Sequence, residues 1–237
     1  MTEPKQTAAA FTRALEERMG GRVHSVVLYG SVARGEAVEG VSDINVLVLL
    51  DRVDSTALQE LAPLARRWTE SGNTAPLLMA EDEWRQAADV FAIELSDMKD
   101  AHDILHGRDP LTELTVEFSA LRLQVERELR GKLIQLREGM LLSGDDQQAI
   151  GKLLLVALPS FLTYLRATLR LVDRPVPATS PEVLEQAGVV LGVDPAPLLR
   201  VWEARSRRHA VKASLDAALV NGYYAVAEKT AAFVDNL

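Results

Sequence analysis

Cysteine is absent from this 237-residue sequence, so the chain offers no disulfide framework and no thiol or cysteine–metal chemistry. Aromatic residues make up only 5%, which leaves no evident platform for stacking nucleic-acid bases. The formal net charge is -8, whereas a nucleic-acid surface needs clustered Lys and Arg. These scarcities argue against a nucleic-acid partner.

Long apolar runs are also missing, since none approaches the roughly 20 residues that span a bilayer. No secretion-signal pattern opens the sequence. We therefore expect no membrane partner and a cytoplasmic location. With 48% hydrophobic and 25% charged residues, the composition is that of a globular protein with one large or two small domains.

The most informative stretch is residues 29–50, YGSVARGEAVEGVSDINVLVLL. A Gly30-Ser31 step follows a predicted apolar strand, and small residues there let backbone N–H groups approach an anion closely. A second buried strand is predicted to begin at about Asp43. Because side chains alternate along a strand, Asp43 and Asn45 are expected on one face. The stretch therefore predicts two oxygen ligands beside a phosphate-binding turn.

This stretch resembles the signature of the nucleotidyltransferase superfamily related to DNA polymerase beta, which includes the aminoglycoside nucleotidyltransferases. The residues that match it in order and spacing are Gly30, Ser31, Arg34, Gly35, Ser42, Asp43 and Ile44. The resemblance implies ATP or another nucleoside triphosphate as substrate, bound by Gly30, Ser31, Arg34 and Ser42. It also implies Mg²⁺, with Asp43 and Glu94 as catalytic carboxylates and a ligand set of Asp43, Asn45 and Glu94.

Asn45 departs from the pattern, because the superfamily has a second Asp at this position. Mg²⁺ prefers hard, anionic oxygen ligands, and an amide supplies one neutral carbonyl oxygen. Two unit charges about 4 Å apart interact by ~4 kcal/mol at an effective dielectric of 20, so the loss beside a divalent ion is roughly twice that before desolvation. Asn45 therefore predicts a weakened or one-metal site, and a deliberately introduced substitution is an alternative origin for it.

Glu94 lies within the apolar run of residues 90–95, which is predicted as a strand. A lone acid among apolar neighbours is costly to bury unless it is paired or binds a cation. The superfamily places a third carboxylate on a later strand, and Glu94 would fill that place or act as general base. The alternative is an edge-strand Glu that points to solvent.

A predicted helix after this run carries several charged side chains. They are Asp97, Lys99, Asp100, His102, Asp103 and His106. We interpret them as a solvated helix face rather than a metal cluster. Lys99 is a positional candidate for a contact to the triphosphate.

The predicted fold class is α/β (α+β): a nucleotidyltransferase-like domain with a small mixed sheet over residues 1–110, then an all-α helical bundle over 111–237. In the first part we predict helices over 3–19 and 55–70, strands over 23–29 and 76–80, and a short helix over 81–88. In the second we predict helices over 112–140, 146–171, 180–188, from 194, and over 207–234. In relatives with both parts, the acceptor lies between them.

The helical part offers two weaker site candidates. Glu126 is a candidate base, but we prefer to interpret it as part of a surface row of Arg–Glu pairs. Near the C-terminal end is a basic cluster of Arg200, Arg205, Arg207, Arg208 and His209. Its spacing does not match the Arg-(4 to 6 residues)-His motif of toxin–antitoxin RNase domains, so we interpret it as a basic helix end.

Two functions remain open. The first is a Mg²⁺-dependent nucleotidyltransferase that transfers a nucleoside monophosphate to a hydroxyl of a small molecule or protein. The second keeps the fold without catalysis, as a nucleotide-binding, regulatory or partner-binding module related to toxin–antitoxin systems. Apolar residues on the bundle helices would serve a homo-oligomer as readily as a core.

Overall fold

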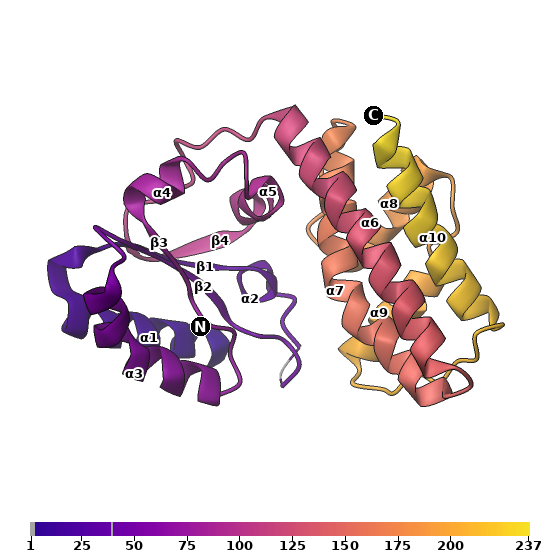
Figure 1. The fold of residues 1–237 in the computed structure, drawn as a ribbon, viewed down its shortest axis with the longest axis horizontal. Coiled ribbons are helices and arrows are strands. Elements are labelled where there is room, and N and C mark those ends of the chain that lie inside the picture. The colour runs from indigo at the N-terminus through magenta and orange to yellow at the C-terminus, as the bar shows by residue number, and fades with distance from the viewer. Residues whose placement is uncertain (1–2, 39) are drawn as a thin grey trace. The chain divides into compact units, whose positions relative to one another are not determined.

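The computed structural model describes residues 3–38 and 40–237, and the chain forms two compact units, the second of which begins at Glu117 (Figure 1). We expected the boundary near residue 110. Leu111 and Leu114 are instead buried in the core of the first unit, beside Val27. The fold class is the one predicted, a small mixed sheet with helices followed by a region of helices only.

The described part of the first unit contains one four-stranded sheet in the order β3-β2-β1-β4. The central strands β1 and β2 are antiparallel, β4 pairs antiparallel with β1, and β3 runs parallel to β2. The strand bounds are Val23–Tyr29 for β1, Asn45–Leu50 for β2, Leu77–Ala80 for β3 and His102–Gly107 for β4. The sheet is therefore mixed, as predicted.

Each face of the sheet is covered by its own helices (Figure 1). Alternate strand residues such as Leu28 and Val48 pack in one core under α1 (Glu3–Met19) and α3 (Ser55–Glu70). The opposite residues, among them Leu47, pack in a second core with side chains of α4 (Glu81–Arg85) and α5 (Ala92–Asp100). Both faces are buried, which explains why β2 is apolar almost throughout.

Local sequence signals account for most of these elements. The predicted bounds of α1, β1 and α3 are confirmed, and β3 and α4 differ only at their ends. The Asp54 side chain accepts a hydrogen bond from the Ala57 N–H, a cap that begins α3. The three-residue helix η1 (Gly20–Arg22) follows α1 and leads into β1.

The predictions for residues 90–95 and 102–106 were wrong. Residues 92–95 belong to helix α5, not to a strand, and His102 begins β4 rather than continuing a helix, whereas residues 97–100 are helical as predicted. A short apolar run does not distinguish a strand from a buried helix by periodicity alone. Ile93 and Leu95 are buried, as either structure would allow.

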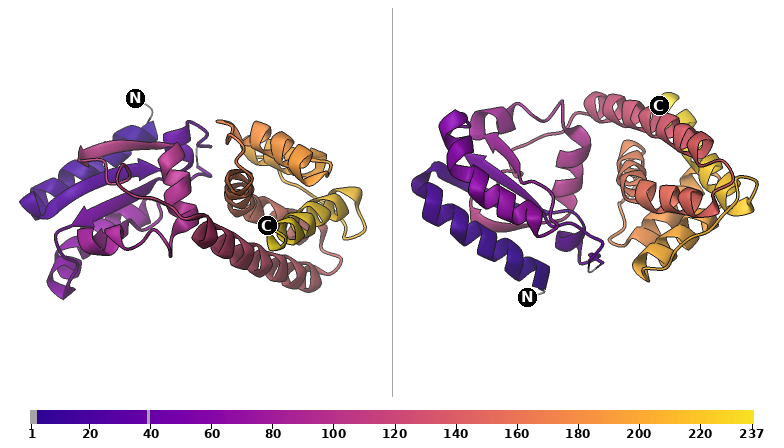
Figure 2. Two further views of the ribbon diagram at one scale, coloured as in Figure 1. Left: turned by 90° about the horizontal axis from the view of Figure 1, so that it is seen from above. Right: turned by 60° about the horizontal axis from the view of Figure 1, so that its bottom comes forward.

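The second unit, whose residues are all described, contains five helices. They are α6 (Phe118–Ser143), α7 (Gln147–Leu171), α8 (Ser180–Leu191), α9 (Ala196–Ser206) and α10 (Ala218–Asp235). Helices α6 and α7 lie side by side, and α10 packs against α6 (Figures 1 and 2). Three predicted ends were wrong: α6 begins at Phe118 rather than at residue 112, α8 passes Gly188 and ends before Gly192, whose φ is +64°, and α10 begins only at Ala218.

Helix α7 corrects the expectation about long apolar segments. It is the one helix in the described ranges whose length and hydropathy would suffice to cross a bilayer. The core helix of a globular protein meets the same criteria, and 44% of the most apolar window of α7 is buried. Leu154, Leu158 and Phe161 are among the side chains that α7 contributes to the core of the bundle.

Candidate functional site

Gly30 makes the turn that ends β1 and begins α2 (Ser31–Arg34). Its φ is +76° and its ψ is -151°, a backbone conformation that favours glycine. The first bond within α2 runs from the Arg34 N–H to the Gly30 carbonyl, 3.1 Å away. The N–H groups of residues 31–33 therefore have no hydrogen-bond acceptor within the helix. Such N–H groups at a glycine turn suit an anionic ligand.

Asn45, the first residue of β2, lies directly beside this turn. It pairs with Tyr29 across the antiparallel ladder. A Cβ placed on Gly30 would lie 2.9 Å from the Asn45 amide nitrogen, Nδ2. The Asn45 side chain thus occupies the space next to the Gly30 α-carbon. Gly30 and Asn45 therefore lie side by side, as predicted.

Asp43 lies two residues before β2, in irregular backbone rather than in the predicted strand. Its side chain accepts a hydrogen bond at Oδ2 from the Thr74 hydroxyl, with 3.0 Å between the oxygens. Both residues are exposed to solvent. Nothing in the local sequence pointed to Thr74, because it lies 31 residues away on the loop after α3.

Glu94 lies in the first turn of α5 and is exposed. Burial, and then the negative charge of Glu94, raise the pKa of the Tyr29 hydroxyl to about 12. Tyr29 directly precedes Gly30, so Glu94 acts electrostatically on the residue beside the glycine turn. Glu94 therefore lies on a helix instead of the predicted strand.

Arg34 and Ser42 are engaged within the protein. The Arg34 guanidinium donates from Nη2 to the Asp97 carbonyl at 2.8 Å and lies 2.6 Å from the Asp97 carboxylate. The Arg34 side chain is only 6% exposed, so this ion pair joins α2 to α5. The Ser42 hydroxyl accepts from the Val38 N–H at 2.9 Å and closes the loop before Asp43.

The histidines and acids of residues 97–106 do not gather into a metal site. On β4, His102 lies 3.3 Å from Asp109, Asp103 accepts from Lys5 at 2.6 Å, and His106 lies 2.8 Å from Glu16. Within residues 3–38 and 40–237, no group of three or more His, Cys, Asp or Glu side chains could hold a metal ion. Asp97, Lys99 and Asp100 lie on a helix, as interpreted, whereas His102, Asp103 and His106 lie on a strand.

Lys99 and the candidates of the helical unit also have protein partners. The Lys99 ammonium donates to the Leu114 carbonyl, which holds residues 111–116 on the first unit. On α6, Glu126 accepts from Arg122 at 3.2 Å and from Arg130 at 3.3 Å, which matches the surface-row interpretation. In the basic cluster, Arg207 pairs with Glu203 at 2.8 Å.

The oxygen donors near Gly30 fit a magnesium ion that arrives with a nucleotide. Asp43 supplies one carboxylate and Asn45 one amide oxygen, too few for a cage made of protein alone. Mg²⁺ usually keeps several waters and is bound by one or two carboxylates together with substrate phosphates. This donor set matches that mode of binding, with Asp43 as its charged member.

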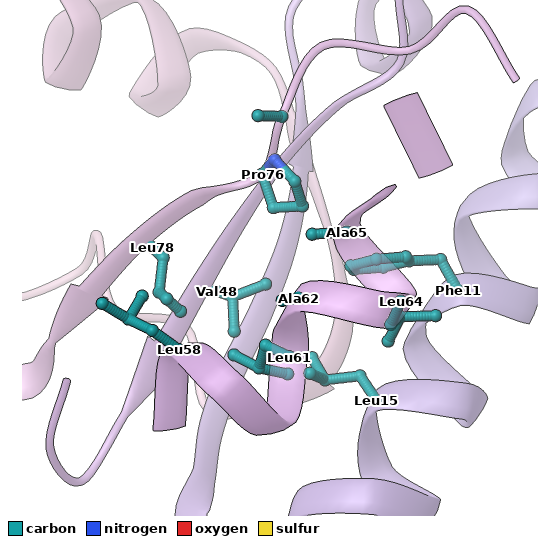
Figure 3. A pocket seen from close by; sticks show the side chains of 11 residues that line it. Phe11, Leu15, Val48, Leu58, Leu61, Ala62, Leu64, Ala65, Pro76 and Leu78 are labelled. Atoms are coloured by element: carbon teal, nitrogen blue, oxygen red, sulfur yellow. The ribbon is translucent and has the colours of Figure 1, made fainter. Parts of the chain in front are cut away.

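An apolar pocket lies in a different part of the first unit (Figure 3). Its volume is about 410 Å³, and it lies between α1, α3 and the sheet face that carries Val48 and Leu78. Its lining side chains are all apolar, so it offers no group to bind a triphosphate.

Comparisons with known proteins agree with this fold. Residues 10–122 match the family described as "Nucleotidyltransferase domain". The fold is similar to the crystal structure of spectinomycin adenyltransferase AAD(9) from Enterococcus faecialis with ATP and spectinomycin. That similarity has a TM-score of 0.59 at 12% identity and covers 95% of this chain and 98% of the other. No curated protein matches this sequence significantly.

Proposed function

Because the chain carries a nucleotidyltransferase domain of the superfamily related to DNA polymerase beta, we propose that it transfers a nucleoside monophosphate from ATP to a hydroxyl of a small molecule. The observation that carries the proposal is the meeting of the Gly30 turn with Asn45, near Asp43 and within the electrostatic reach of Glu94. The similarity to an adenyltransferase crystallised with ATP and spectinomycin supports a nucleotide substrate and a small hydroxylated acceptor.

The proposed roles follow from the position of each group. The N–H groups of residues 31–33 and the Ser31 hydroxyl bind the outer phosphates. Asp43 and the Asn45 carbonyl hold Mg²⁺, which when bound neutralises phosphate charge. Glu94, exposed and near the turn, takes the proton of the acceptor hydroxyl. The acceptor oxygen then bonds to the α-phosphorus while the bond to the β-phosphate oxygen breaks, so pyrophosphate leaves.

Arg34 and Ser42 have supporting roles in this scheme. Arg34 holds α2 against α5 through Asp97, which fixes the phosphate-binding turn relative to the helix that carries Glu94. Ser42 closes the loop that leads to Asp43. We include a cytoplasmic location and a homo-oligomer in the proposal as expectations from the composition and the apolar helix faces.

A second candidate function is a nucleotide-binding module without catalysis. The observation that favours it is Asn45, which places a neutral amide where a second carboxylate would add charge, with its nitrogen against Gly30. Such a site would bind a triphosphate through the turn but stabilise the transferring phosphoryl group poorly. Regulation by nucleotide, or binding of a partner, would then be its purpose.

Calorimetric titration of the full-length protein with ATP, with Mg²⁺ and with EDTA, tests both candidates. Either one predicts nucleotide binding that strengthens with Mg²⁺. Incubation with α-labelled ATP and a panel of aminocyclitol and aminoglycoside acceptors then separates them, because only the enzyme forms labelled acceptor and pyrophosphate. Absence of binding at millimolar ATP would refute both.

A further inference from the structure

Thr74 lies on the loop after α3, where the protein core holds its backbone. The Trp68 indole N–H donates to the Thr74 carbonyl at 2.8 Å. Trp68 is only 5% exposed and packs against Phe11, with ring centroids 4.6 Å apart. The loop is therefore tied to the interface of α1 and α3. The backbone that carries the exposed Thr74 side chain is therefore held in place.

The Thr74 hydroxyl donates a hydrogen bond to Oδ2 of Asp43, with 3.0 Å between the oxygens. Asp43 itself lies on irregular backbone, where the pairing of β2 does not yet constrain it. An exposed carboxylate samples several rotamers, and ordering it costs conformational entropy on ligand binding. A hydrogen bond to one oxygen selects one rotamer and leaves the other oxygen available.

We propose that Thr74 is a positioning residue that pre-orients the Asp43 carboxylate for binding of a magnesium–nucleotide complex, an inference that rests on the proposed function. Pre-orientation of Asp43 matters more here than in a site with two carboxylate ligands. Of the two proposed magnesium ligands, Asn45 is neutral and only Asp43 is charged. Hydrogen bonds to metal-ligating carboxylates typically contribute 10- to 100-fold to metal affinity. Because Thr74 and Asp43 are exposed, we expect the lower end, about tenfold.

The test compares Thr74→Val, which keeps the shape and removes the hydroxyl, with Thr74→Ser, which keeps the hydroxyl. Thr69→Val is the matched control, since the Thr69 hydroxyl donates to the Arg66 carbonyl on the same helix, away from Asp43. Affinity for Mg²⁺–ATP is measured by calorimetry, and Mn²⁺ binding in the presence of ATP by electron paramagnetic resonance. Thermal unfolding checks that each variant is folded.

We expect Thr74→Val to weaken Mg²⁺–ATP binding about tenfold and ATP binding in EDTA by less than twofold, whereas Thr74→Ser and Thr69→Val bind as the native protein does. In an Asp43→Asn background, Thr74→Val should cause no further loss, because its effect passes through Asp43. Native-like metal–nucleotide affinity in Thr74→Val would overturn the inference and leave the proposed function standing. If the native protein itself binds no nucleotide, both are refuted.

Discussion

The Nη2 nitrogen of Arg34 lies 2.6 Å from Oδ1 of Asp97, and the two side chains are 6% and 16% exposed. This ion pair joins two elements of the candidate site, because Arg34 ends α2 and Asp97 lies one turn after Glu94 on α5. The sequence motif suggested Arg34 as a phosphate ligand. In the folded chain its guanidinium is directed to another part of the same protein.

Removal of this ion pair should destabilise the first unit. Arg34→Met leaves a poorly solvated carboxylate, and loss of one partner of a buried pair costs about 3–5 kcal/mol of unfolding free energy. This loss of unfolding free energy is measured by urea unfolding in a Trp202→Phe background, monitored through the fluorescence of Trp68 and Trp84. The control Arg52→Ala removes an exposed partner of Asp54 and should leave the free energy of unfolding nearly unchanged. Unchanged stability with lost ATP binding would instead make Arg34 a phosphate ligand.

Gly30 should tolerate a side chain poorly for two separable reasons. Gly30→Ala forces a non-glycine residue to a φ of +76° and brings its Cβ to 2.9 Å from the Asn45 amide nitrogen. We expect a loss of roughly 2–3 kcal/mol in unfolding free energy. Gly35→Ala is the matched control, since Gly35 has a φ of +75° but open space around it, and should cost about 1 kcal/mol.

A double-mutant cycle isolates the steric part of this effect. Asn45→Ala removes the amide that a Gly30 side chain would meet, so Gly30→Ala should cost less in that background than in the native protein. Denaturant unfolding of the four proteins measures the coupling. Strict additivity would show that the Asn45 contact contributes nothing.

Asn45→Asp should strengthen metal-dependent nucleotide binding. A second carboxylate beside the divalent ion adds favourable Coulomb energy, so we expect at least tenfold tighter binding of ATP with Mg²⁺. In EDTA the sign should reverse, because the new negative charge repels the triphosphate. Calorimetry under both conditions checks this, and equal affinities in both would place the nucleotide away from Asn45.

The pKa of Tyr29 reports on the negative charge of Glu94. Burial and then the Glu94 charge raise the pKa of Tyr29 to about 12, so Glu94→Gln should lower that pKa while burial keeps it above the ordinary value. Absorbance at 295 nm, as a difference against Tyr29→Phe, follows the ionisation. An unchanged pKa in Glu94→Gln would show that Glu94 does not act on this site.

The same shift has a consequence for stability. Because the folded-state pKa lies above the unfolded value near 10, the contribution of neutral Tyr29 is present below about pH 10 and lost as pH rises through about 12. Thermal unfolding of native protein and Tyr29→Phe between pH 8 and 12 measures this. The native protein should lose stability more steeply in the alkaline range, and parallel curves would contradict the assignment.

The elements that sequence reasoning predicted well are those whose signals are local. Apolar periodicity marked α1 and α3, and the step from an apolar run to Gly30 marked the end of β1. The motif also covers residues that do meet in space, since Gly30 directly follows β1 and Asn45 begins the paired strand β2. Residues 90–95 failed because their apolar run suits a strand and a buried helix equally.

The amino-acid sequence by itself thus determined most of the elements, the two-part organisation and the presence of a turn suited to phosphate. Only the tertiary structure decided which partners the polar side chains have: Asp97 for Arg34, 63 residues away, and Thr74 for Asp43, 31 residues away. The physical reason is that backbone propensities depend on near neighbours. The partner of a side chain depends instead on which distant segments the packed core brings together.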